Sequence, residues 1–492
     1  MKIKLYTYIC LVGLLSICLS SCDLARDLES FNPNFALDAD EAIVNEASAE
    51  LALIGVYSGF RQRSSGSGNP EIYLIPSLMS GVLTNTLFNT GQEALGFINN
   101  EPIPVNASTS LGAYARMYDI INRCNWLIEK VSPLPEDVFV TPGRKTQIIA
   151  EAKAVRATAN FYLLRLFGQF YDVGSKYGIT LRLEPARSSE AFPRNTVGEV
   201  YDAILSDLDE AIADAPDLRT RFFTNKTYAK GLKAKVMLYK GDYQQAAMLA
   251  KEVIDGTGDT FRLATDYAGI FQGQTPSLFE SPEVIFGSKG EPQGGLGIGN
   301  FIGGYWAAID PSYLADAQVS TTIGTQSIDL DGGRIPSLTF DNNGTLDTYK
   351  YSDAASGQLY EMIYHLRMSE VYLIYAEANA RSNNSVTQDA LDALNAIRIR
   401  AGATSTGGDG FETYPATISY EQFLEAVRKE KWAELGLETG EEWYDLVRYH
   451  FVDGFDVTKV KSTATNPNKY ILPIDVVNIE SGGNVVEQNP GY

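Results

Sequence analysis

One segment, residues 226–255, constrains the fold of this chain more than any other. Apolar side chains recur in it at steps of three and four residues, on either side of Gly241-Asp242, and that spacing puts them on one face of a helix. The positions are Ala229, Leu232, Val236 and Tyr239 before the turn, and Ala246, Ala250 and Val253 after it. The pattern predicts two antiparallel amphipathic helices, 226–240 and 243–255, joined by a tight turn.

The same pattern recurs elsewhere in the chain. Residues 367–382 and 387–402 predict a second helix pair, and 111–132 with 144–171 predict a third, degenerate one. A further helix is expected over 41–62. Antiparallel pairs with small residues at their crossing are similar to tetratricopeptide repeats. Because the repeat period is irregular, we expect a mainly α-helical scaffold with long insertions.

The composition changes between the helix pairs. Residues 257–360 are dominated by Gly, Ser, Thr, Asn and Asp and show no helical period, and residues 71–110 are mixed and loop-rich. Long loops on a rigid scaffold usually carry function. We therefore predict a helical scaffold over about 41–256 and 361–450, a loop-rich, ligand-facing insertion over about 257–360, and a C-terminal tail over 451–492.

The N-terminus has the features of a bacterial lipoprotein signal. A basic start is followed by an apolar run, then by small residues, and then by Cys22. We expect residues 1–21 to be removed, Cys22 to be acylated, and residues 22–40 to form a lipidated tether. Each buried methylene contributes about 0.8 kcal/mol, so several acyl chains would anchor the protein permanently.

The charge of the chain excludes some partners. The sequence has 40 basic and 61 acidic residues and a formal net charge of −21. Loss of residues 1–21 makes it more negative still, because that segment contains Lys2 and Lys4 and no acid. Nucleic acid would be repelled. No second apolar run approaches the roughly 20 residues that a membrane-spanning helix needs, so the lipid is the expected membrane anchor.

Few residues suit catalysis or metal binding. The chain has two histidines, His365 and His450, and neither has a Cys, His or acidic neighbour at metal-ligand spacing. No Gly-x-Ser-x-Gly string follows a strand pattern. After processing and acylation, Cys124 is the one remaining thiol, so no internal disulfide is expected. We therefore expect a protein without enzymatic activity, metal ion or cofactor.

Several segments, in order along the chain, together form a family pattern. Residues 151–172 read EAKAVRATANFYLLRLFGQFYD, 283–286 EVIF, 367–378 RMSEVYLIYAEA, 394–398 LNAIR, 428–435 RKEKWAEL, 443–448 WYDLVR, 472–474 LPI and 488–492 QNPGY. With the lipoprotein signal, these segments closely resemble the SusD/RagB family of Bacteroidetes nutrient-binding outer-membrane lipoproteins. The match runs from Cys22 to the last residue.

The resemblance implies a SusD-like fold over residues 41–492. It also implies a lipid-anchored position on the outer membrane, facing the cell exterior, and a SusC-like TonB-dependent transporter as partner, over whose barrel the lipoprotein sits as a lid. The sequence does not visibly reproduce the aromatic cluster of the starch-binding members. This departure argues against starch as the ligand.

Most charged residues in the matched segments are interpreted as structural. They lie on predicted helices beside apolar stripes, so we expect them to form ion pairs between helices. They are Arg156, Glu370, Glu377, Arg398, Arg428, Glu434, Asp445 and Arg448. We also expect Trp126, Trp432 and Trp443 in the core, and residues 489–492 as a packed tail.

The best candidate for ligand contact is residues 301–313, in the non-helical insertion. Sugars are bound by flat aromatic faces with polar groups at the rim of the site. Tyr305 and Trp306 are adjacent and follow two glycines, and Trp306 is the only tryptophan outside the predicted helices. Packing of Trp306 in the core is the alternative. Asp310 and Arg334 are candidate polar partners.

A second candidate segment is residues 84–97, where Phe88 and Asn89 lie among other polar residues. The resemblance supports this segment, because family members often place ligand contacts there. The sequence thus predicts a non-catalytic surface lipoprotein that captures an oligosaccharide and delivers it to the transporter. One alternative keeps the architecture and partner but binds peptides, as the RagB branch implies. Another is a structural surface lipoprotein without a nutrient ligand.

Overall fold

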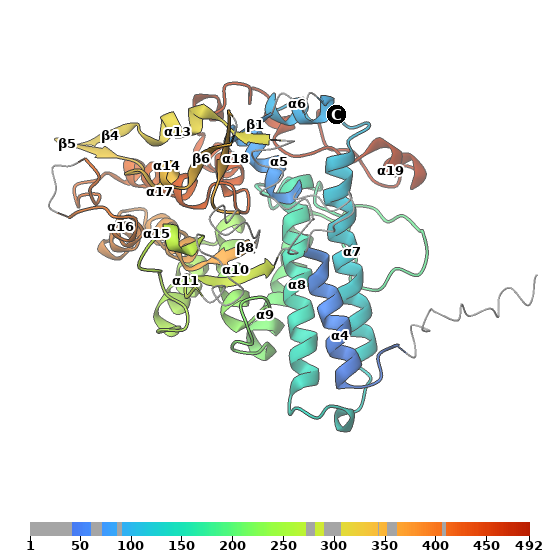
Figure 1. The fold of residues 1–492 in the computed structure, drawn as a ribbon. Helices are drawn as coiled ribbons and strands as arrows, with labels where there is room; N and C mark the ends of the chain where they lie inside the picture. The colour runs from blue at the N-terminus through green and yellow to red at the C-terminus, as the bar shows by residue number, and fades with distance from the viewer. Residues whose placement is uncertain are drawn as a thin grey trace, which may run out of the picture.

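The computed structural model describes residues 42–60, 71–85, 91–271, 281–289, 307–342, 344–351, 362–405 and 410–492. Cys22, the signal segment 1–21 and the tether 22–40 lie outside the described residues. Helices dominate the described part, and the strands are short and gathered towards one side (Figure 1). The mainly α-helical fold predicted from the sequence is confirmed. None of the described helices is both long and apolar enough to cross a bilayer.

Three helices run side by side at one end of the molecule (Figure 1). They are α4 (Glu46–Tyr57), α7 (Ser108–Val131) and α8 (Arg144–Phe167), with the short 3-10 turns η1 (Ser58–Phe60) and η2 (Glu136–Val138) beside them. Each was predicted with slightly different bounds. The helix expected over 144–171 ends earlier because the chain turns into an extended conformation at Gly168 (φ −114°, ψ 158°).

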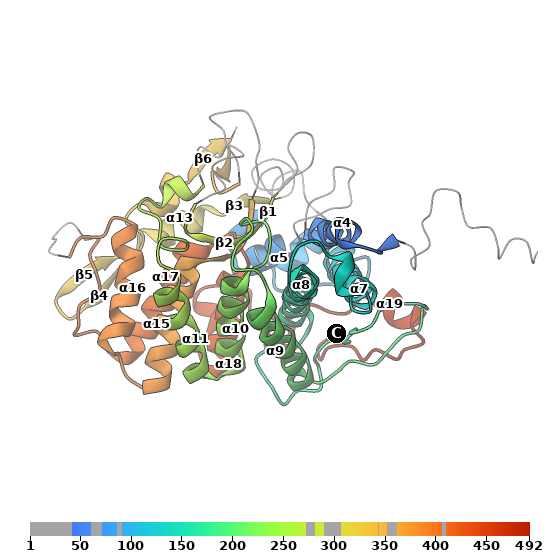
Figure 2. The same ribbon diagram turned by 90° about the horizontal axis from the view of Figure 1, so that it is seen from below.

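The remaining long helices continue from α8 as a row in which each packs on the next (Figure 2). The row consists of α9 (Val197–Asp214), α10 (Lys226–Lys240), α11 (Tyr243–Gly256), α15 (Met368–Asn383) and α16 (Gln388–Arg400). Helix α17 (Tyr420–Leu435) packs on α15, and α18 (Glu441–Asp453) packs on α17. The predicted pairs at 226–255 and 367–402 are confirmed as α10–α11 and α15–α16.

The α10–α11 pair shows how the sequence specifies its helix ends. The Asn225 side chain accepts a hydrogen bond from the Tyr228 N–H and so caps α10. Gly241 ends that helix with φ +87°, a left-handed conformation that glycine adopts without strain. The next residue, Asp242, accepts from the Gln245 N–H and caps α11. The predicted turn at Gly241-Asp242 is therefore confirmed.

Within the described residues, the strands form four antiparallel pairs. They are β1 (Leu83–Asn85) with β3 (Ala307–Ile309), β2 (Val284–Lys289) with β8 (Met362–Arg367), β4 (Ser320–Ile323) with β5 (Gln326–Asp329), and β6 (Thr339–Asn342) with β7 (Thr345–Thr348). The described parts of the predicted insertion also contain η3 (Ala268–Ile270), α13 (Pro311–Ala317) and α14 (Arg334–Ser337). Short paired strands thus replace much of the expected loop.

Residues 71–110, expected to be loop-rich, contain two helices that the sequence analysis missed. They are α5 (Glu71–Ser80) and α6 (Gln92–Ile98). Pro76 lies inside α5, where it removes one helical hydrogen bond. Its ring packs beside Gly440 of the α17–α18 turn, and a Cβ built on that glycine would lie 2.6 Å from the ring. The close approach requires glycine at position 440, which also has φ +83°.

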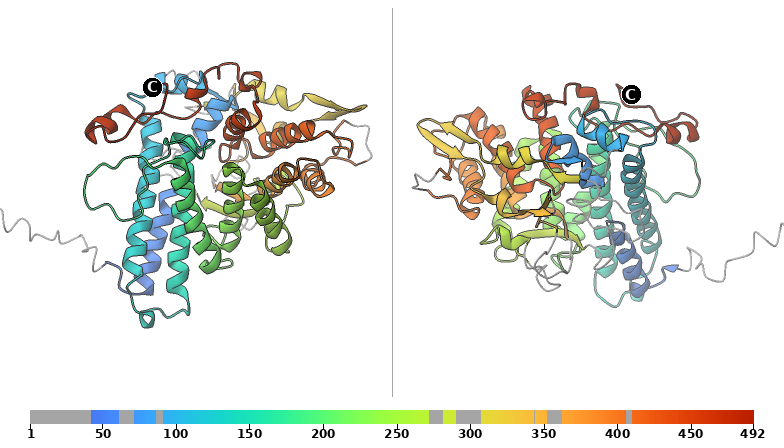
Figure 3. Two further views of the ribbon diagram at one scale, coloured as in Figure 1. Left: turned by 180° about the vertical axis from the view of Figure 1, so that it is seen from behind. Right: turned by 45° about the horizontal axis from the view of Figure 1, so that its top comes forward.

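The C-terminal region folds back over α7 and α8, and its last residue lies close to α6 (Figure 1). It contains η4 (Val457–Lys459), η5 (Pro467–Lys469) and α19 (Val476–Ser481). The buried Asn489 amide donates hydrogen bonds to the carbonyls of Phe167 (2.8 Å) and Leu472 (2.7 Å). The predicted packed tail is confirmed. Figure 3 shows α19 and the β4–β5 hairpin at opposite ends of the molecule.

Buried ion pairs join the helices, as predicted. Arg156 of α8 binds Asp207 of α9 at 2.7 Å, and Arg448 of α18 binds Glu377 of α15 at 2.6 Å. The other predicted residues that pair between elements are Glu370 with Lys235, Arg398 with Glu430, Glu434 with Arg367 and Asp445 with Lys431. The exception is Arg428, which pairs with Glu425 one turn away on α17.

The tryptophans differ in their burial. Trp443 is 1% exposed, and its indole N–H donates to the Tyr470 carbonyl at 3.0 Å. Trp432 is partly buried and packs against the core. The core prediction was wrong for Trp126, because its ring stays partly exposed beneath the cations of Lys130 and Arg187.

Candidate ligand-binding site

The β1–β3 pair brings the starts of the two candidate segments together. Asn85 at the end of β1 is the Cα partner of Ala307 at the start of β3. In an antiparallel pair these two chain ends lie at the same edge of the ladder. Phe88 and Asn89 follow Asn85 closely, and Tyr305 and Trp306 precede Ala307. All four residues lie outside the described residues.

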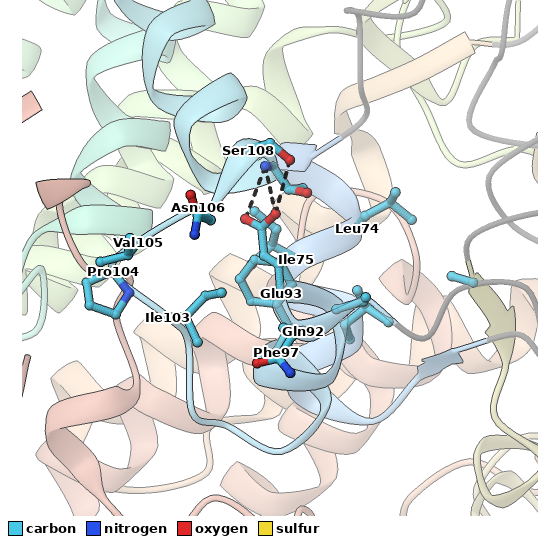
Figure 4. Close-up of a pocket in the computed structure, with 15 residues that line it drawn as sticks. Leu74, Ile75, Gln92, Glu93, Phe97, Ile103, Pro104, Val105, Asn106 and Ser108 are labelled. Carbon is cyan, nitrogen blue, oxygen red and sulfur yellow. Dashed lines mark hydrogen bonds between the residues drawn. The ribbon is translucent and has the colours of Figure 1, made fainter. Parts of the chain in front are cut away.

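A cavity of about 640 Å³ opens beside this end of the ladder (Figure 4). We call it the β1–β3 cavity. Its walls are mostly apolar, with a few polar groups, as is common for ligand sites. The lining comes from α5 (Leu74, Ile75, Leu78), α6 with its preceding residue (Gly91, Gln92, Glu93, Ala94, Phe97), the α6–α7 connection (Ile103, Pro104, Val105, Asn106), the start of α7 (Ser108, Thr109), and Ala307 of β3.

The α6–α7 connection contains two asparagines in left-handed conformations, and the first of them holds the connection in place. Asn100 (φ +55°) is 2% exposed, donates to the Met79 carbonyl at 3.0 Å, and accepts from the Thr463 hydroxyl at 2.6 Å. Asn106 (φ +56°) has the same backbone geometry and lines the cavity. Asparagine tolerates this region better than most residues. These contacts fix one wall of the cavity before any ligand binds.

Glu93 fixes the opposite corner. Its carboxylate accepts hydrogen bonds from the backbone N–H of Thr109 at 2.9 Å and from the Ser108 hydroxyl at 3.4 Å (Figure 4). It also accepts one from the backbone N–H of Ser110 at 2.9 Å. A negative charge is favourable at the N-terminus of a helix such as α7. The carboxylate is therefore occupied in joining α6 to α7. Gln92 and Asn106 differ, because their side chains make no hydrogen bond to any residue that the structure describes.

Asp310 lies outside the lining of this cavity. Its carboxylate accepts from the Ser312 N–H (2.9 Å) and hydroxyl (2.8 Å) and caps α13. Its own N–H donates to the Val82 carbonyl at 2.9 Å, which extends the β1–β3 contact. The local geometry gives Asp310 a structural role.

Arg334 is buried away from the cavity. It is 3% exposed, and its guanidinium lies 2.6 Å from Glu430, 3.3 Å from Glu434 and 3.6 Å from Asp331. A ligand cannot reach this guanidinium without breaking buried ion pairs. Arg334 therefore belongs to a buried ion-pair cluster and does not line the β1–β3 cavity.

His365 has a structural position in the core. His365 is buried between the hydroxyls of Tyr162 (2.8 Å) and Ser288 (2.7 Å) and stacks on Phe286. Burial, with the charge of Lys235, lowers the pKa of His365 to about 3. In the described part of the chain, no three metal-ligating side chains converge on one point.

Two family sequence models match separate parts of the chain. The model described as "Starch-binding associating with outer membrane" matches residues 79–238, and the model of the SusD family matches residues 318–458. The SusD-like protein P2 of Formosa agariphila is 24% identical over an alignment that covers 95% of this chain and 96% of the relative.

Solved structures share the fold. A putative sugar binding protein from Bacteroides vulgatus superposes with a TM-score of 0.73 at 24% identity, covering 92% of this chain and 99% of that one. A laminarin binding SusD-like protein gives a TM-score of 0.67 at 23% identity, covering 92% and 100%. The two sequence models, the full-length relative and the shared architecture agree, and this chain belongs to the SusD/RagB family.

Proposed function

We propose that this protein is a non-catalytic, lipid-anchored surface protein that captures an oligosaccharide in the β1–β3 cavity and delivers it to a SusC-like TonB-dependent transporter. The observation that carries the proposal is the cavity itself. It is preformed, about 640 Å³ in volume, and lies where two aromatic-containing segments meet the described fold. Membership of a carbohydrate-binding family supports a glycan as its ligand.

In this proposal, the two segments next to β1 and β3 supply the aromatic side chains that a sugar site needs. The described walls offer apolar surface and the polar side chains of Gln92 and Asn106. A sugar also needs flat aromatic faces against its C–H patches, together with hydrogen-bonding groups. Trp306, Tyr305 and Phe88 would supply the faces, and Asn89 a further amide. Each belongs to a segment that adjoins the paired residues Asn85 and Ala307.

The first test is a glycan and peptide array probed with the full-length protein in detergent. We expect binding to one glycan class, and we expect Trp306→Ala to weaken that binding at least tenfold, since a central aromatic residue at a binding site contributes about 2 kcal/mol. Titration calorimetry with the best glycan measures the change. The glycan should be recovered unhydrolysed after incubation, as a binding protein requires.

Trp126→Ala is the matched control, because it removes a partly exposed tryptophan from the C-terminal part of α7, outside the cavity lining. It should leave glycan affinity unchanged. Glycan binding that survives Trp306→Ala and Phe88→Ala would refute the site and keep the function. Binding to peptides alone, or to nothing, would refute the glycan assignment.

The partner is tested separately. The lipoprotein signal ending at Cys22 and the family description "associating with outer membrane" support a position at that membrane. We expect the affinity-tagged protein, purified in mild detergent from its own cells, to retain a TonB-dependent barrel identified by mass spectrometry. Recovery of the protein without such a barrel, at yields that preserve other membrane complexes, would contradict the transporter role.

A further inference from the structure

A second cleft of about 410 Å³ lies on the side of α7, beyond the β1–β3 cavity. We call it the α7 cleft. One wall is a single stripe of α7, and the other is the irregular segment 180–192 between α8 and α9. The C-terminal region closes it with Ile474, Asn478 and Val486. Figures 1 and 3 show this segment and α19 together beside α7.

The floor of the α7 cleft is aromatic. Tyr114 and Tyr118, one turn apart on α7, lie with their ring centroids 4.7 Å apart. Phe192 faces them from the other wall and is 39% exposed. The guanidinium of Arg182 lies 4.2 Å from the Phe192 ring centroid. Three aromatic rings in one cleft offer the flat apolar faces that bind the C–H surface of a sugar.

The wall opposite α7 is fixed although it has no regular secondary structure. Asn125, 2% exposed, donates from its amide to the carbonyls of Arg182 and Glu184, both at 3.0 Å. The Asn122 side chain accepts from the Ala186 N–H at 2.8 Å. The Tyr118 hydroxyl donates to the Thr180 carbonyl at 2.8 Å. Side chains of α7 thus hold the segment in place, which lowers the ordering cost of binding a ligand.

The rim of the cleft carries polar side chains that form no hydrogen bond or ion pair with the rest of the described structure. Within the described residues, the side chains of Arg182, Glu184, Glu190 and Asn478 form no hydrogen bond or ion pair. Both signs of charge are present, so the rim suits hydroxyl groups, which donate and accept, better than a polyanion. By contrast, many buried charges of the helical scaffold are paired, as with Arg156 and Asp207.

We propose that the α7 cleft is a second saccharide-binding site, which takes another segment of the same neutral oligosaccharide chain. The inference rests on the proposed function, because it assumes a glycan ligand. The two sites share α7: Ser108 and Thr109 line the first, and the stripe from Leu111 onward lines the second. Between them the packing around Ala107 and Phe167 leaves no room for a water molecule, so they are separate sites.

Two sites on one rigid helix make binding depend on ligand length. When one end of a long chain is bound, the other end reaches the second site at an effective concentration that is typically in the millimolar range. A short oligosaccharide gains nothing from this effect. Variants of the α7 cleft should therefore weaken the binding of long chains selectively.

The test uses the array-selected glycan as fragments of about three and about twelve sugar units, with laminarin and starch fragments included as defined probes. We expect Phe192→Ala and Arg182→Ala each to weaken binding of the long fragment about tenfold and to leave the short fragment's tightest binding unchanged. Leu183→Ala is the matched control, because this side chain is 48% exposed on the same segment and outside the lining. Calorimetry on full-length protein measures each affinity.

Arg182→Ala is the variant least expected to disturb the fold, because the guanidinium forms no hydrogen bond to the described residues. Without it, segment 180–192 keeps its hydrogen bonds to α7. Equal affinity of both variants and wild type for the long fragment would overturn the second site and leave the proposed function intact. Binding of peptides that depends on Phe192 would also overturn it. Failure of the wild-type protein to bind any glycan would overturn the proposed function, and the second site with it.

Discussion

Replacing Glu434 with glutamine should lower the free energy of unfolding by about 3 kcal/mol. Glu434 on α17 is fully buried, accepts hydrogen bonds from Arg367 and Arg400, and lies 3.3 Å from Arg334. Glutamine keeps the shape of the side chain but removes its charge. The guanidiniums would stay buried with too few carboxylates around them, and such an unpaired buried charge costs about 3–5 kcal/mol. Urea unfolding followed by circular dichroism measures the loss.

The pH dependence identifies the cause. Burial alone would raise the pKa of Glu434, but the charges of Arg400, Arg367 and Arg334 outweigh it and hold the pKa below its usual value of 4.5. A carboxylate with a lowered folded-state pKa contributes stability above the unfolded-state value, and that stability is lost as the pH falls. The gap between wild type and Glu434→Gln should therefore shrink as the pH drops below about 4.5.

The matched control is Glu421→Gln, which removes an exposed carboxylate from the same helix and should change stability by at most about 0.5 kcal/mol. Equal losses for the two variants would show that helix α17, and not the buried cluster, is responsible. A gap at Glu434 that stays constant from pH 7 to pH 3 would rule out the charge as the cause.

The long helices could be predicted because their signals are local. The apolar steps at Leu232 and Val236, and the turn at Gly241, lie within a few residues of one another and need no knowledge of the rest of the chain. Helix α9 was missed although it also carries a local signal. Thr196 and Glu199 form a reciprocal capping box at its start, and buried apolar residues follow at helical spacing.

Elements stabilised by distant contacts gave no such signal. Pro76 argues against a helix at α5, yet α5 forms because its apolar face packs in the core and Pro76 fits against Gly440. The pairing of β1 with β3 joins residues far apart in the sequence, so the pattern of neither strand reveals it. Tertiary packing decided both elements.

The same limit applies to the site. Leu74 and Ile75 line the β1–β3 cavity, but in the sequence they cannot be distinguished from core residues. Arg334 presents the opposite problem. It lies in a polar insertion and resembles a ligand partner, but two of its carboxylate partners, Glu430 and Glu434, come from a helix much later in the chain. Polarity in a loop-rich segment predicts exposure only when no such partner exists.

Glu442, at the start of α18, attaches the wall of the cavity to the scaffold. Its carboxylate accepts a hydrogen bond from the Ser77 hydroxyl of α5. It accepts a second one from the Leu437 N–H at 3.2 Å. Ser77 lies between Ile75 and Leu78, which line the β1–β3 cavity. The second carboxylate oxygen is buried and has no hydrogen-bond partner among the described residues. Burial raises the pKa of Glu442 to about 7, against the lowering effect of these hydrogen bonds.

Glu442→Gln should consequently stabilise the protein at pH 8 and change it little at pH 4. With a folded-state pKa of about 7 and a usual value of 4.5, the folded state binds the proton more tightly than the unfolded state does. Stability then falls as the pH rises between those values, by about 3 kcal/mol. Glutamine stays neutral, so unfolding titrations from pH 4 to pH 8 should show this loss in wild type and in Glu421→Gln but not in Glu442→Gln. Parallel profiles for all three proteins would show that folding does not raise the pKa of Glu442. The pKa shifts of Glu434 and Glu442 have opposite signs because their surroundings differ. Guanidiniums surround Glu434, whereas Glu442 has only neutral hydrogen-bond donors.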